Sequence, residues 1–383
     1  MAEPTLRQSQ AEVLRYRSGW MGISAVPGSG KTWTLSQLAA KLLLTVDLEP
    51  DQELLIVTLS NSAVDNFSSR IGALAREYGL MEGYGYRVRT LHGLAGDIIR
   101  ERPELAGLGN DFRILDEEDA LTLLDELSFE QIKKREEVFL QLIASEVSET
   151  KANEIMWDPK FGMPSLMNGL ANSFISSAKN AGKLPSDLAT LKNSRPVTPL
   201  FQICLDIYQA YQDRLKLLGA VDFNDLIHLA WKCLRTDPEL ARHLARRWPY
   251  ILEDEAQDSS LQQQEILQIL AKLNGNWVRV GDTNQAIYQS FTTADPRLLK
   301  EFIAQPDVRS VDLPESGRSC QAIIDLANQL NAWVQSEHPN ADVRDSLTKP
   351  FILPTQPGDP QQNPPSLPNS LEINTKAFTS DEE

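Results

Sequence analysis

The sequence predicts an α/β fold, in which a parallel sheet is flanked by helices. Three observations indicate this fold. Short runs of aliphatic residues alternate with segments whose apolar residues recur at helical spacing. A glycine-rich turn follows the first run and opens a helix. Two later runs end in carboxylates, and the carboxyl ends of parallel strands are where such folds bind ligands.

The expected strands of this sheet are buried apolar runs. They comprise residues 19–26, 54–59, 250–255 and 277–282. The first run leads through the glycine-rich turn into a helix from about Lys31, in which Leu35, Leu38 and Leu42 recur at helical spacing. Because strands alternate with helices, we expect the strands to pair in parallel.

The middle of the chain has a different character, because helical segments follow one another there without intervening strands. We interpret this part as an all-helical subdomain inserted into the α/β domain. The sheet resumes after it, and a second α/β domain begins later but stays incomplete. The predicted divisions are 1–93 with 222–297 for the α/β domain, 94–221 for the helical insertion, 298–350 for the start of the second domain, and 351–383 for a proline-rich loop with a truncated end.

The composition is that of a globular protein. The chain has 383 residues and a formal net charge of −16, with 42% hydrophobic and 23% charged residues. No uninterrupted apolar stretch reaches about 18 residues, and we expect neither a membrane span nor a signal peptide. The three cysteines lack metal-ligand spacing, which favours reduced thiols in a cytoplasmic protein. The acidity argues against tight binding of nucleic acid, although the charge of a whole chain says little about one groove.

A phosphate-binding loop follows the first strand. Its glycines allow backbone N–H groups to surround phosphates at the positive end of a helix dipole. Lys31 would reach the β- and γ-phosphates of ATP, and the Thr32 hydroxyl would bind Mg²⁺. The residues of this expected site are Ala25, Val26, Pro27, Gly28, Ser29, Gly30, Lys31 and Thr32. A chance turn is the alternative, and the position between a strand and a helix argues against it.

Polar residues follow the two later strands. Asp254 would hold Mg²⁺, and Glu255 would orient and deprotonate the attacking water. Gln285 follows the next strand, where its amide would sense the γ-phosphate. A carboxylate pair at a strand end and a polar turn are common structural features, but the phosphate loop upstream favours the catalytic interpretation.

Taken together, these motifs resemble those of superfamily 1 DNA helicases of the UvrD/Rep/PcrA kind, in the same order over about residues 5–330. The stretch Asp254-Glu255-Ala256-Gln257-Asp258 is the most specific match. The resemblance implies a RecA-like P-loop NTPase domain with ATP and Mg²⁺ as cofactors. It also implies a cytoplasmic, ATP-dependent helicase or translocase that acts in DNA repair and moves 3′ to 5′ on single-stranded DNA or at a duplex junction.

The resemblance assigns roles to further residues. Gln10 resembles the glutamine that reads adenine, and Arg318 resembles an arginine of the second motor domain that contacts the γ-phosphate. For His92 the alternative interpretation is a structural hydrogen bond, and for Tyr288 and Phe291 it is packing in the core. The positions that resemble DNA-contacting residues are Ser60, Asn61, Thr90, His92, Tyr288 and Phe291.

Some positions depart from the family pattern. Trp33 stands where many members have arginine, and Gly317 stands where many have a tyrosine that stacks on adenine. The family's later motifs, including a second arginine for the γ-phosphate, are not recognisable after Arg318. We therefore expect a truncated chain. Its unfinished second domain would expose apolar side chains on its first helix. The residues expected there are Ile323, Ile324, Leu326 and Leu330.

Two alternatives stay open. One is an ATP-binding fragment that does not unwind DNA by itself and depends on a partner chain for the C-terminal half of the motor. The other is a P-loop kinase or GTPase. It is disfavoured because Lys31 and Asp254 lie far apart in the sequence, and because Gln257-Asp258 fits no such enzyme.

Overall fold

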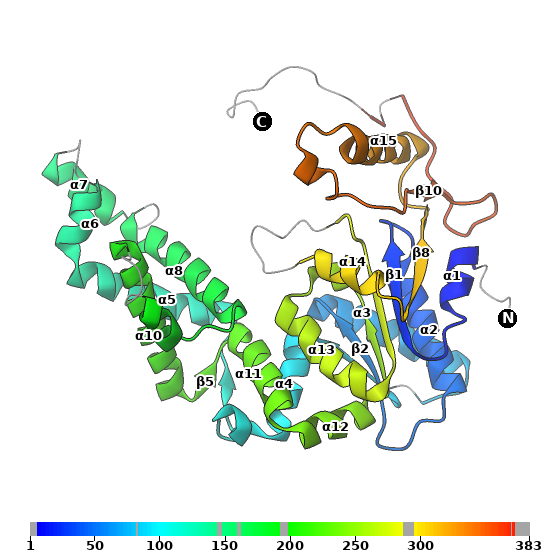
Figure 1. Ribbon diagram of the computed structural model, residues 1–383, viewed down its shortest axis with the longest axis horizontal. Helices are drawn as coiled ribbons and strands as arrows, with labels where there is room; N and C mark the ends of the chain where they lie inside the picture. The colour runs from blue at the N-terminus through cyan, green and yellow to red at the C-terminus, as the bar shows by residue number, and fades with distance from the viewer. Residues whose placement is uncertain are drawn as a thin grey trace. The chain divides into compact units, whose positions relative to one another are not determined.

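The computed structural model describes residues 6–81, 83–143, 148–158, 162–191, 198–285, 295–368 and 370–371. The chain divides into two compact units, and Figure 1 colours it along the sequence. Unit 1 comprises Met1–Thr90 and His243–Glu383, and unit 2 comprises Leu91–Arg242. The division into two units does not test the domain boundaries predicted from the sequence, which stay a prediction.

Unit 1 is built on a parallel sheet of six strands in the order β3-β2-β6-β7-β1-β8, which confirms the predicted α/β fold. The strands are β1 (Trp20–Ala25), β2 (Leu54–Thr58), β3 (Tyr86–Thr90), β6 (Tyr250–Glu253), β7 (Trp277–Gly281) and β8 (Val308–Leu313). The flanking helices include α1 (Gln8–Val13), α2 (Lys31–Thr45), α3 (Asn61–Glu77), α13 (Leu261–Asn274) and α14 (Arg297–Ile303).

The strands predicted from the sequence are the four central ones, whereas sequence analysis missed the edge strands β3 and β8. β2 is buried at every position, as expected for a strand covered on both faces. In β8 only Val308, Val311 and Leu313 are buried. An edge strand of this kind lacks the continuous apolar run that identified the central strands. β8 comes from the range predicted to begin the second domain, yet it pairs with β1.

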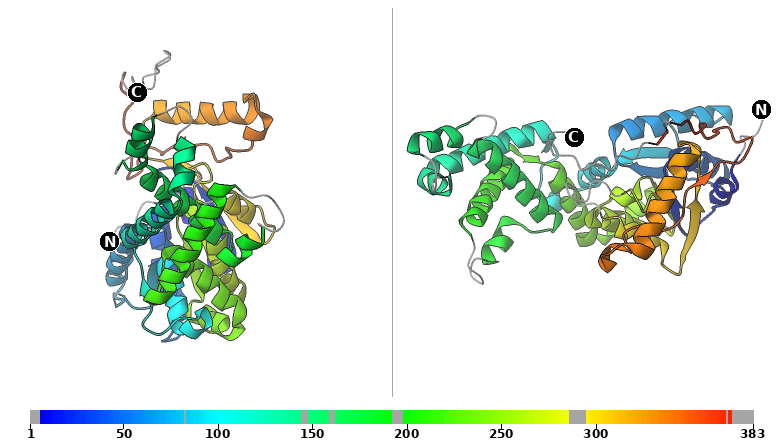
Figure 2. Two further views of the ribbon diagram at one scale, coloured as in Figure 1. Left: turned by 90° about the vertical axis from the view of Figure 1, so that its left-hand side faces the viewer. Right: turned by 90° about the horizontal axis from the view of Figure 1, so that it is seen from above.

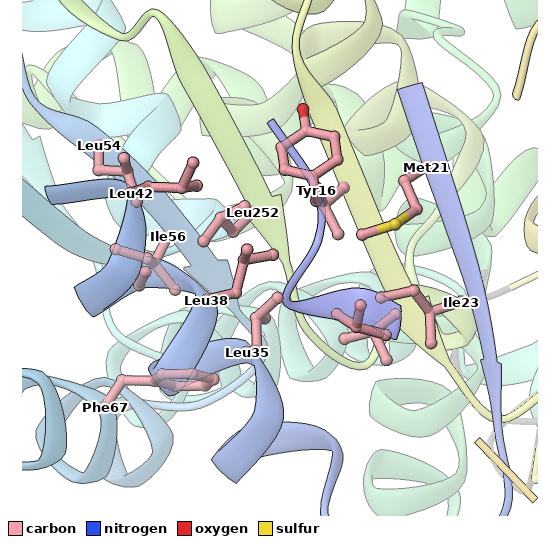
Figure 3. Close-up of a cluster of buried hydrophobic side chains, with 14 of the residues drawn as sticks. Tyr16, Met21, Ile23, Leu35, Leu38, Leu42, Leu54, Ile56, Phe67 and Leu252 are labelled. Atoms are coloured by element: carbon pink, nitrogen blue, oxygen red, sulfur yellow. The ribbon is translucent and has the colours of Figure 1, made fainter. Parts of the chain in front are cut away.

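The core of unit 1 lies between one face of the sheet and helices α1 to α3 (Figure 3). Alternate residues of each strand point to this face, as Met21 and Ile23 of β1 do. Leu35, Leu38 and Leu42 of α2 are all buried, which confirms their predicted helical spacing. Burial of each such side chain contributes about 1.5–3 kcal/mol. This packing therefore holds the start of α2 beside the end of β1.

The opposite face of the sheet is covered by α14 and by aromatic side chains. Trp20 and Trp277 contact each other, and both contact Phe302 of α14. A Cβ atom on Gly22 would come within 2.6 Å of Ile303 Cγ1. Glycine in β1 therefore allows α14 to pack this closely against the sheet.

Unit 2 is helical, which confirms the helical character predicted for the middle of the chain. Among its described residues, the only strands are β4 (Arg113–Ile114) and β5 (Ala220–Val221), which pair with each other. Its buried core is contributed largely by α5, α8 and α10. The helices are α4 (Leu91–Glu101), η1 (Pro103–Ala106), α5 (Glu117–Lys134), α6 (Glu136–Ile143), α7 (Glu149–Met156), α8 (Met163–Asn180), α9 (Pro185–Leu191), α10 (Pro199–Leu218), α11 (Phe223–Thr236) and α12 (Pro238–Arg247), which crosses into unit 1. No helix in the described part of the chain is long and apolar enough to cross a membrane.

The chain after β8 returns across the carboxyl ends of the strands. It forms β9 (Glu315–Ser316), α15 (Gln321–Glu337), η3 (Ala341–Val343) and β10 (Leu353–Pro354). Helix α15 is orange and lies at this end of the sheet in Figure 1 and in the left view of Figure 2. Ile323, Leu326 and Leu330 are exposed as predicted, but the prediction for Ile324 was wrong, since it is only 1% exposed. Ile324 lies about 100° around the helix from Ile323, outside the stripe that the other three share.

The proline-rich residues after 350 do not form a simple extended loop. β10 pairs in parallel with β9. The Asn363 side-chain amide donates hydrogen bonds to the carbonyls of Ser316 and Ser319, at 2.6 and 2.8 Å. These bonds hold the segment against the residues that follow β8.

Candidate nucleotide site

The phosphate loop connects β1 to α2 and depends on two glycine conformations. Gly28 has a φ of 77° and Gly30 a φ of 83°, in the left-handed region that favours glycine. A Cβ atom on Gly28 would also lie 2.5 Å from Arg318 Cβ and 2.6 Å from Ser316 Oγ. Helix α2 begins at Lys31, so the N–H groups of its first turn lack helical acceptors and are suited to an anion.

Lys31 and Glu255 form an ion pair, in which Lys31 Nζ donates to Glu255 Oε2 at 2.8 Å. The side-chain amide of Gln257 donates to the same carboxylate oxygen at 3.0 Å. Among the residues that the structure describes, Glu255 is the one non-glycine with a positive φ, at 52°. Such a conformation costs about 1–3 kcal/mol and is found mainly where function requires it.

Asp254 lies directly before Glu255 and faces the start of α2. The Thr32 hydroxyl donates to Asp254 Oδ2 at 3.2 Å. Burial, with a smaller contribution from the charge of Glu255, raises the pKa of Asp254 from 3.8 to about 7. The other carboxylate oxygen, Oδ1, is buried and has no hydrogen-bond partner among the described residues.

These two residues fit the chemistry of a magnesium site. A buried carboxylate oxygen without a partner and a hydroxyl group next to it are the hard oxygen ligands that Mg²⁺ prefers. No group of three or more His, Cys, Asp or Glu residues that could hold a metal occurs in the described part of the chain. Mg²⁺ would therefore be held by Asp254 and Thr32 together with phosphate oxygens and water, as is usual for this ion.

Gln257 connects the carboxylates to the turn that contains Gln285. Its Oε1 accepts a hydrogen bond from the backbone N–H of Asp282 at 3.0 Å. In the same turn, the Asn284 side chain donates to the Thr348 carbonyl at 2.7 Å and accepts from the Thr348 N–H at 2.8 Å. The turn after β7 is thus joined both to the residues after β6 and to the chain beyond α15.

A cavity of about 640 Å³ opens on these residues, a size within the usual range for small-molecule sites. Ala25, Val26 and Ser29 of the phosphate loop are buried, and Asp254 borders the cavity through its bond to Thr32. The structure thus brings most of the predicted ATP-site residues to one place. Those that line the cavity are Gln10, Pro27, Gly28, Gly30, Lys31, Thr32, Glu255, Gln285 and Arg318.

The side-chain amide of Gln10 is hydrogen-bonded within the protein. Its Nε2 donates to the Ser29 carbonyl at 3.2 Å, and its Oε1 accepts from the Arg7 backbone N–H at 3.2 Å. Gln10 therefore supports the phosphate loop directly, and its contact with a nucleobase stays a prediction.

Sequence analysis missed Arg7, Asp359 and Gln361, which also line the cavity. Arg7 Nε lies 2.8 Å from Asp359 Oδ2, and the two side chains are only 9% and 7% exposed. Arg7 Nη1 also donates to the carbonyls of Ser29 and Glu315, at 3.1 and 2.9 Å. The partners are 352 positions apart, and Asp359 lies in a proline-rich segment, so no local pattern indicates the pair.

Three of the predicted DNA-contacting residues lie in unit 1. Ser60 and Asn61 are exposed at the start of α3. The Ser60 hydroxyl caps this helix by accepting a hydrogen bond from a backbone N–H of its first turn at 3.3 Å. Thr90 is the last residue of β3.

Of the other predicted DNA contacts, the structure describes His92. His92 lies in α4 of unit 2, with its ring 5.4 Å from that of Phe223. Burial lowers the pKa of His92, so the ring is neutral at pH 7. This environment also fits a packing role. Tyr288 and Phe291 lie outside the described residues.

The parallel sheet, the phosphate loop between β1 and α2, and the carboxylates after β6 define a RecA-like P-loop domain. The chain belongs to the UvrD/REP helicase N-terminal domain family, whose model matches residues 6–307. This match confirms the family resemblance inferred from the sequence motifs.

Individual relatives agree with this assignment. The chain is 30% identical to DNA helicase II of Salmonella typhimurium, over 85% of this chain and 40% of the relative. It is 29% identical to DNA helicase II of Escherichia coli, again over 85% of this chain and 40% of the relative. It is 28% identical to the ATP-dependent DNA helicase PcrA of Leuconostoc citreum, over 84% of this chain and 38% of the relative. The chain spans about 40% of the length of these curated relatives.

Proposed function

We propose that this chain is the ATP-binding part of a DNA helicase or translocase, in which ATP hydrolysis drives movement along single-stranded DNA. The main support is the meeting of Lys31, Thr32, Asp254 and Glu255 beside one cavity of about 640 Å³. The names of the relatives, DNA helicase II and ATP-dependent DNA helicase PcrA, support the same activity.

The cavity residues suit the successive parts of ATP. Backbone N–H groups of residues 28–32 and the Lys31 ammonium would bind the β- and γ-phosphates. Thr32 and Asp254 would hold Mg²⁺, which neutralises phosphate charge when it is bound. Gln10 would lie at the adenine end of the site, next to the phosphate loop that it supports.

Hydrolysis requires a base for the attacking water, a group that contacts the γ-phosphate, and a cation that stabilises the charge of the transition state. Glu255 would accept a proton from the attacking water, because its carboxylate lies beside the Lys31 position that receives the γ-phosphate. Gln285 would contact the γ-phosphate from the turn after β7, and Gln257 would hold that turn against the carboxylates. Arg318 would stabilise the negative charge that develops on the transferred group.

We extend the proposal to the predicted partner and location. Ser60 and Asn61 present exposed polar side chains that would contact single-stranded DNA, and Thr90 would contribute from the end of β3. Movement would run 3′ to 5′ in the cytoplasm.

One observation favours a second version of this function, in which the chain acts only together with a partner chain. Four apolar residues of α15 are exposed, namely Ile323 (42%), Leu326 (39%), Leu330 (54%) and Trp333 (41%). A partner that supplies the other half of the motor would cover such a stripe. In this version the isolated chain binds ATP, hydrolyses it poorly and unwinds nothing.

The test combines ATP binding, ATP hydrolysis and strand separation, each measured with and without single-stranded DNA. We expect the chain to bind ATP more tightly than GTP. Hydrolysis that single-stranded DNA stimulates would support the motor, and binding without unwinding would support the partner-dependent version. A chain that binds neither nucleotide contradicts both versions. Tighter binding of GTP than of ATP would favour the GTPase alternative.

A further inference from the structure

The residues that line the nucleotide cavity are of two chemical kinds. Lys31, Thr32 and Glu255 are suited to phosphates and to the attacking water. Gln10, Trp33, Pro360 and Gln361 bring rings and amides, which are suited to an aromatic base. Two of these four residues come from the proline-rich segment after β10.

Residues 355–363, here called the return loop, are held against the residues that follow β9. Asn363 Oδ1 accepts hydrogen bonds from the backbone N–H and the hydroxyl of Thr355, at 2.8 and 2.9 Å, which closes the loop on itself. Asn363 Nδ2 donates to the carbonyls of Ser316 and Ser319. The loop is therefore anchored at its base by one side chain.

Glycine at position 317 allows the return loop to approach. A Cβ atom on Gly317 would lie 2.1 Å from the Gln361 carbonyl oxygen and 2.8 Å from Gln361 Cγ. Both distances are too short for any side chain. Gly317 and Gln361 therefore fit together only because position 317 has no side chain, and this contact places Gln361 on the cavity wall.

The tip of the loop is fixed by the Arg7–Asp359 ion pair, which is bidentate, with distances of 2.8 and 3.2 Å. The Gln361 backbone N–H donates to Asp359 Oδ1 at 2.8 Å, so the same carboxylate orients Pro360 and Gln361. The hydrogen bonds from Arg7 hold the pKa of Asp359 below its usual range. The charges of Arg7 and Asp359 offset each other within this ion pair, and Pro360 and Gln361 bring a ring and an amide to the cavity wall.

From these contacts we propose that the return loop is the nucleobase wall of the ATP site, with Pro360 against a face of the purine and Gln361 near its polar edge. The inference rests on the proposed ATP-binding function and adds the part of the chain that recognises the base. It predicts that the loop contributes to affinity for a whole nucleotide and not to affinity for its phosphates alone.

The experiment compares ATP with inorganic tripolyphosphate as probes, in calorimetric titrations of the full chain. The test variant combines Pro360→Gly with Gln361→Ala. The matched control combines Pro365→Gly with Gln329→Ala, the same changes at exposed positions that lie outside the return loop and do not line the cavity. We expect the test variant to lose about tenfold in ATP affinity, the effect of losing one or two good contacts, with tripolyphosphate affinity unchanged. The control should change neither.

Three outcomes separate this inference from the function on which it rests. Equal ATP affinity in the test variant and the wild type overturns the nucleobase wall. An equal loss for ATP and tripolyphosphate also overturns it, since the loop would then support the phosphate loop or the fold, and thermal unfolding distinguishes these two. ATP binding by the wild type without any DNA-stimulated hydrolysis contradicts the motor function but leaves the wall intact.

Discussion

Lys31 Nζ donates to Glu255 Oε2 at 2.8 Å, so the cation expected to bind phosphate is paired with the carboxylate expected to activate water. The γ-phosphate of ATP carries more negative charge than a carboxylate and would compete for the same ammonium group. If Lys31 turned to the phosphate, the Glu255 carboxylate would leave this ion pair and be available to the attacking water. In the proposed function, one exchange of partners would therefore couple binding of the nucleotide to its hydrolysis.

Replacing Lys31 with alanine should abolish binding of ATP, with a loss in affinity of more than about a hundredfold, because the flexible charge that meets the β- and γ-phosphates is removed. Lys41→Ala in the same helix is the matched control, since Lys41 is exposed and does not line the cavity. Calorimetric titration with ATP measures both variants. Wild-type affinity in Lys31→Ala would refute the phosphate-loop assignment.

Glu255→Gln should retain ATP binding while hydrolysis falls by about 10²- to 10⁴-fold, because the amide cannot accept the proton of the attacking water. The exposed Glu301 of α14 provides the control substitution Glu301→Gln. Single-turnover hydrolysis with prebound ATP separates the two steps. Normal hydrolysis by Glu255→Gln would show that another group is the base.

The raised pKa of Asp254 predicts a specific dependence of stability on pH. Between its ordinary value of 3.8 and its folded value of about 7, the folded protein binds this proton more tightly than the unfolded chain does. The contribution of Asp254 to the free energy of unfolding therefore falls as pH rises through this window, by at most about 1.4 kcal/mol per pH unit. Asp254→Asn should remove this slope in nucleotide-free protein.

Urea denaturation between pH 5 and pH 8 measures the effect, with the exposed Asp47→Asn as control. If the free energy of unfolding changed with pH equally in the wild type and in Asp254→Asn, the raised pKa of Asp254 would be contradicted. Binding of ATP with Mg²⁺ should have the opposite dependence and strengthen as pH rises toward 8, because the metal ligand is the charged carboxylate.

Arg279 of β7 forms a buried ion pair with Glu253, the last residue of β6. It is completely buried and forms two hydrogen bonds with Glu253, at 2.7 and 3.2 Å. Its guanidinium also lies 4.7 Å from the ring of Trp277. Arg279→Met should lower the free energy of unfolding by about 3–5 kcal/mol, since Glu253 would be left buried and charged without its cation, with the Ser259 hydroxyl still donating to it at 2.8 Å.

The double variant Glu253→Leu with Arg279→Met should recover most of this stability, because no unpaired charge then remains. Chemical denaturation of the two single variants and the double variant gives the coupling energy. Additive losses would show that the pair has no special role. A double variant that is stable but slow in ATP hydrolysis would show that the pair also positions Asp254 and Glu255.

Binding to DNA should favour single strands and weaken with salt, in spite of the net charge of −16. Cations of the protein release counterions from DNA only where they contact its phosphates. The dependence of DNA affinity on salt concentration therefore reports such local contacts. Fluorescence anisotropy of a labelled oligonucleotide at two ionic strengths measures it. An affinity that does not respond to salt would point away from phosphate contacts.

The sequence was sufficient for the parts of the fold and site that are local. The central strands are buried on both faces and consist mostly of apolar residues. The phosphate loop is one short stretch between a strand and a helix. The edge strands β3 and β8 were missed because exposed or half-buried residues interrupt their buried ones. The exposure of Ile324 was predicted wrongly because composition alone does not show which side of α15 faces inward.

The base side of the cavity could not be predicted for a different reason. Arg7 lies in the segment that carries Gln10, Asp359 lies in a proline-rich segment, and the two residues are 352 positions apart. The links from Asn284 to Thr348 and from Asn363 to Ser316 are of the same kind. Contacts of this type follow from topology, and residue spacing within one segment does not reveal them.

The distance along the chain between Arg7 and Asp359 also sets an order for assembly during translation. A ribosome emits Arg7 and the phosphate loop early, but the Asp359 carboxylate, which neutralises Arg7, leaves the exit tunnel 352 residues after Arg7. Until then the Arg7 guanidinium has no carboxylate partner at this position, and Gln361 is absent from the cavity. Nascent chains arrested before Asp359 should therefore show a folded sheet with weak retention on immobilised ATP, and chains arrested well beyond Asn363 should be retained like the released protein.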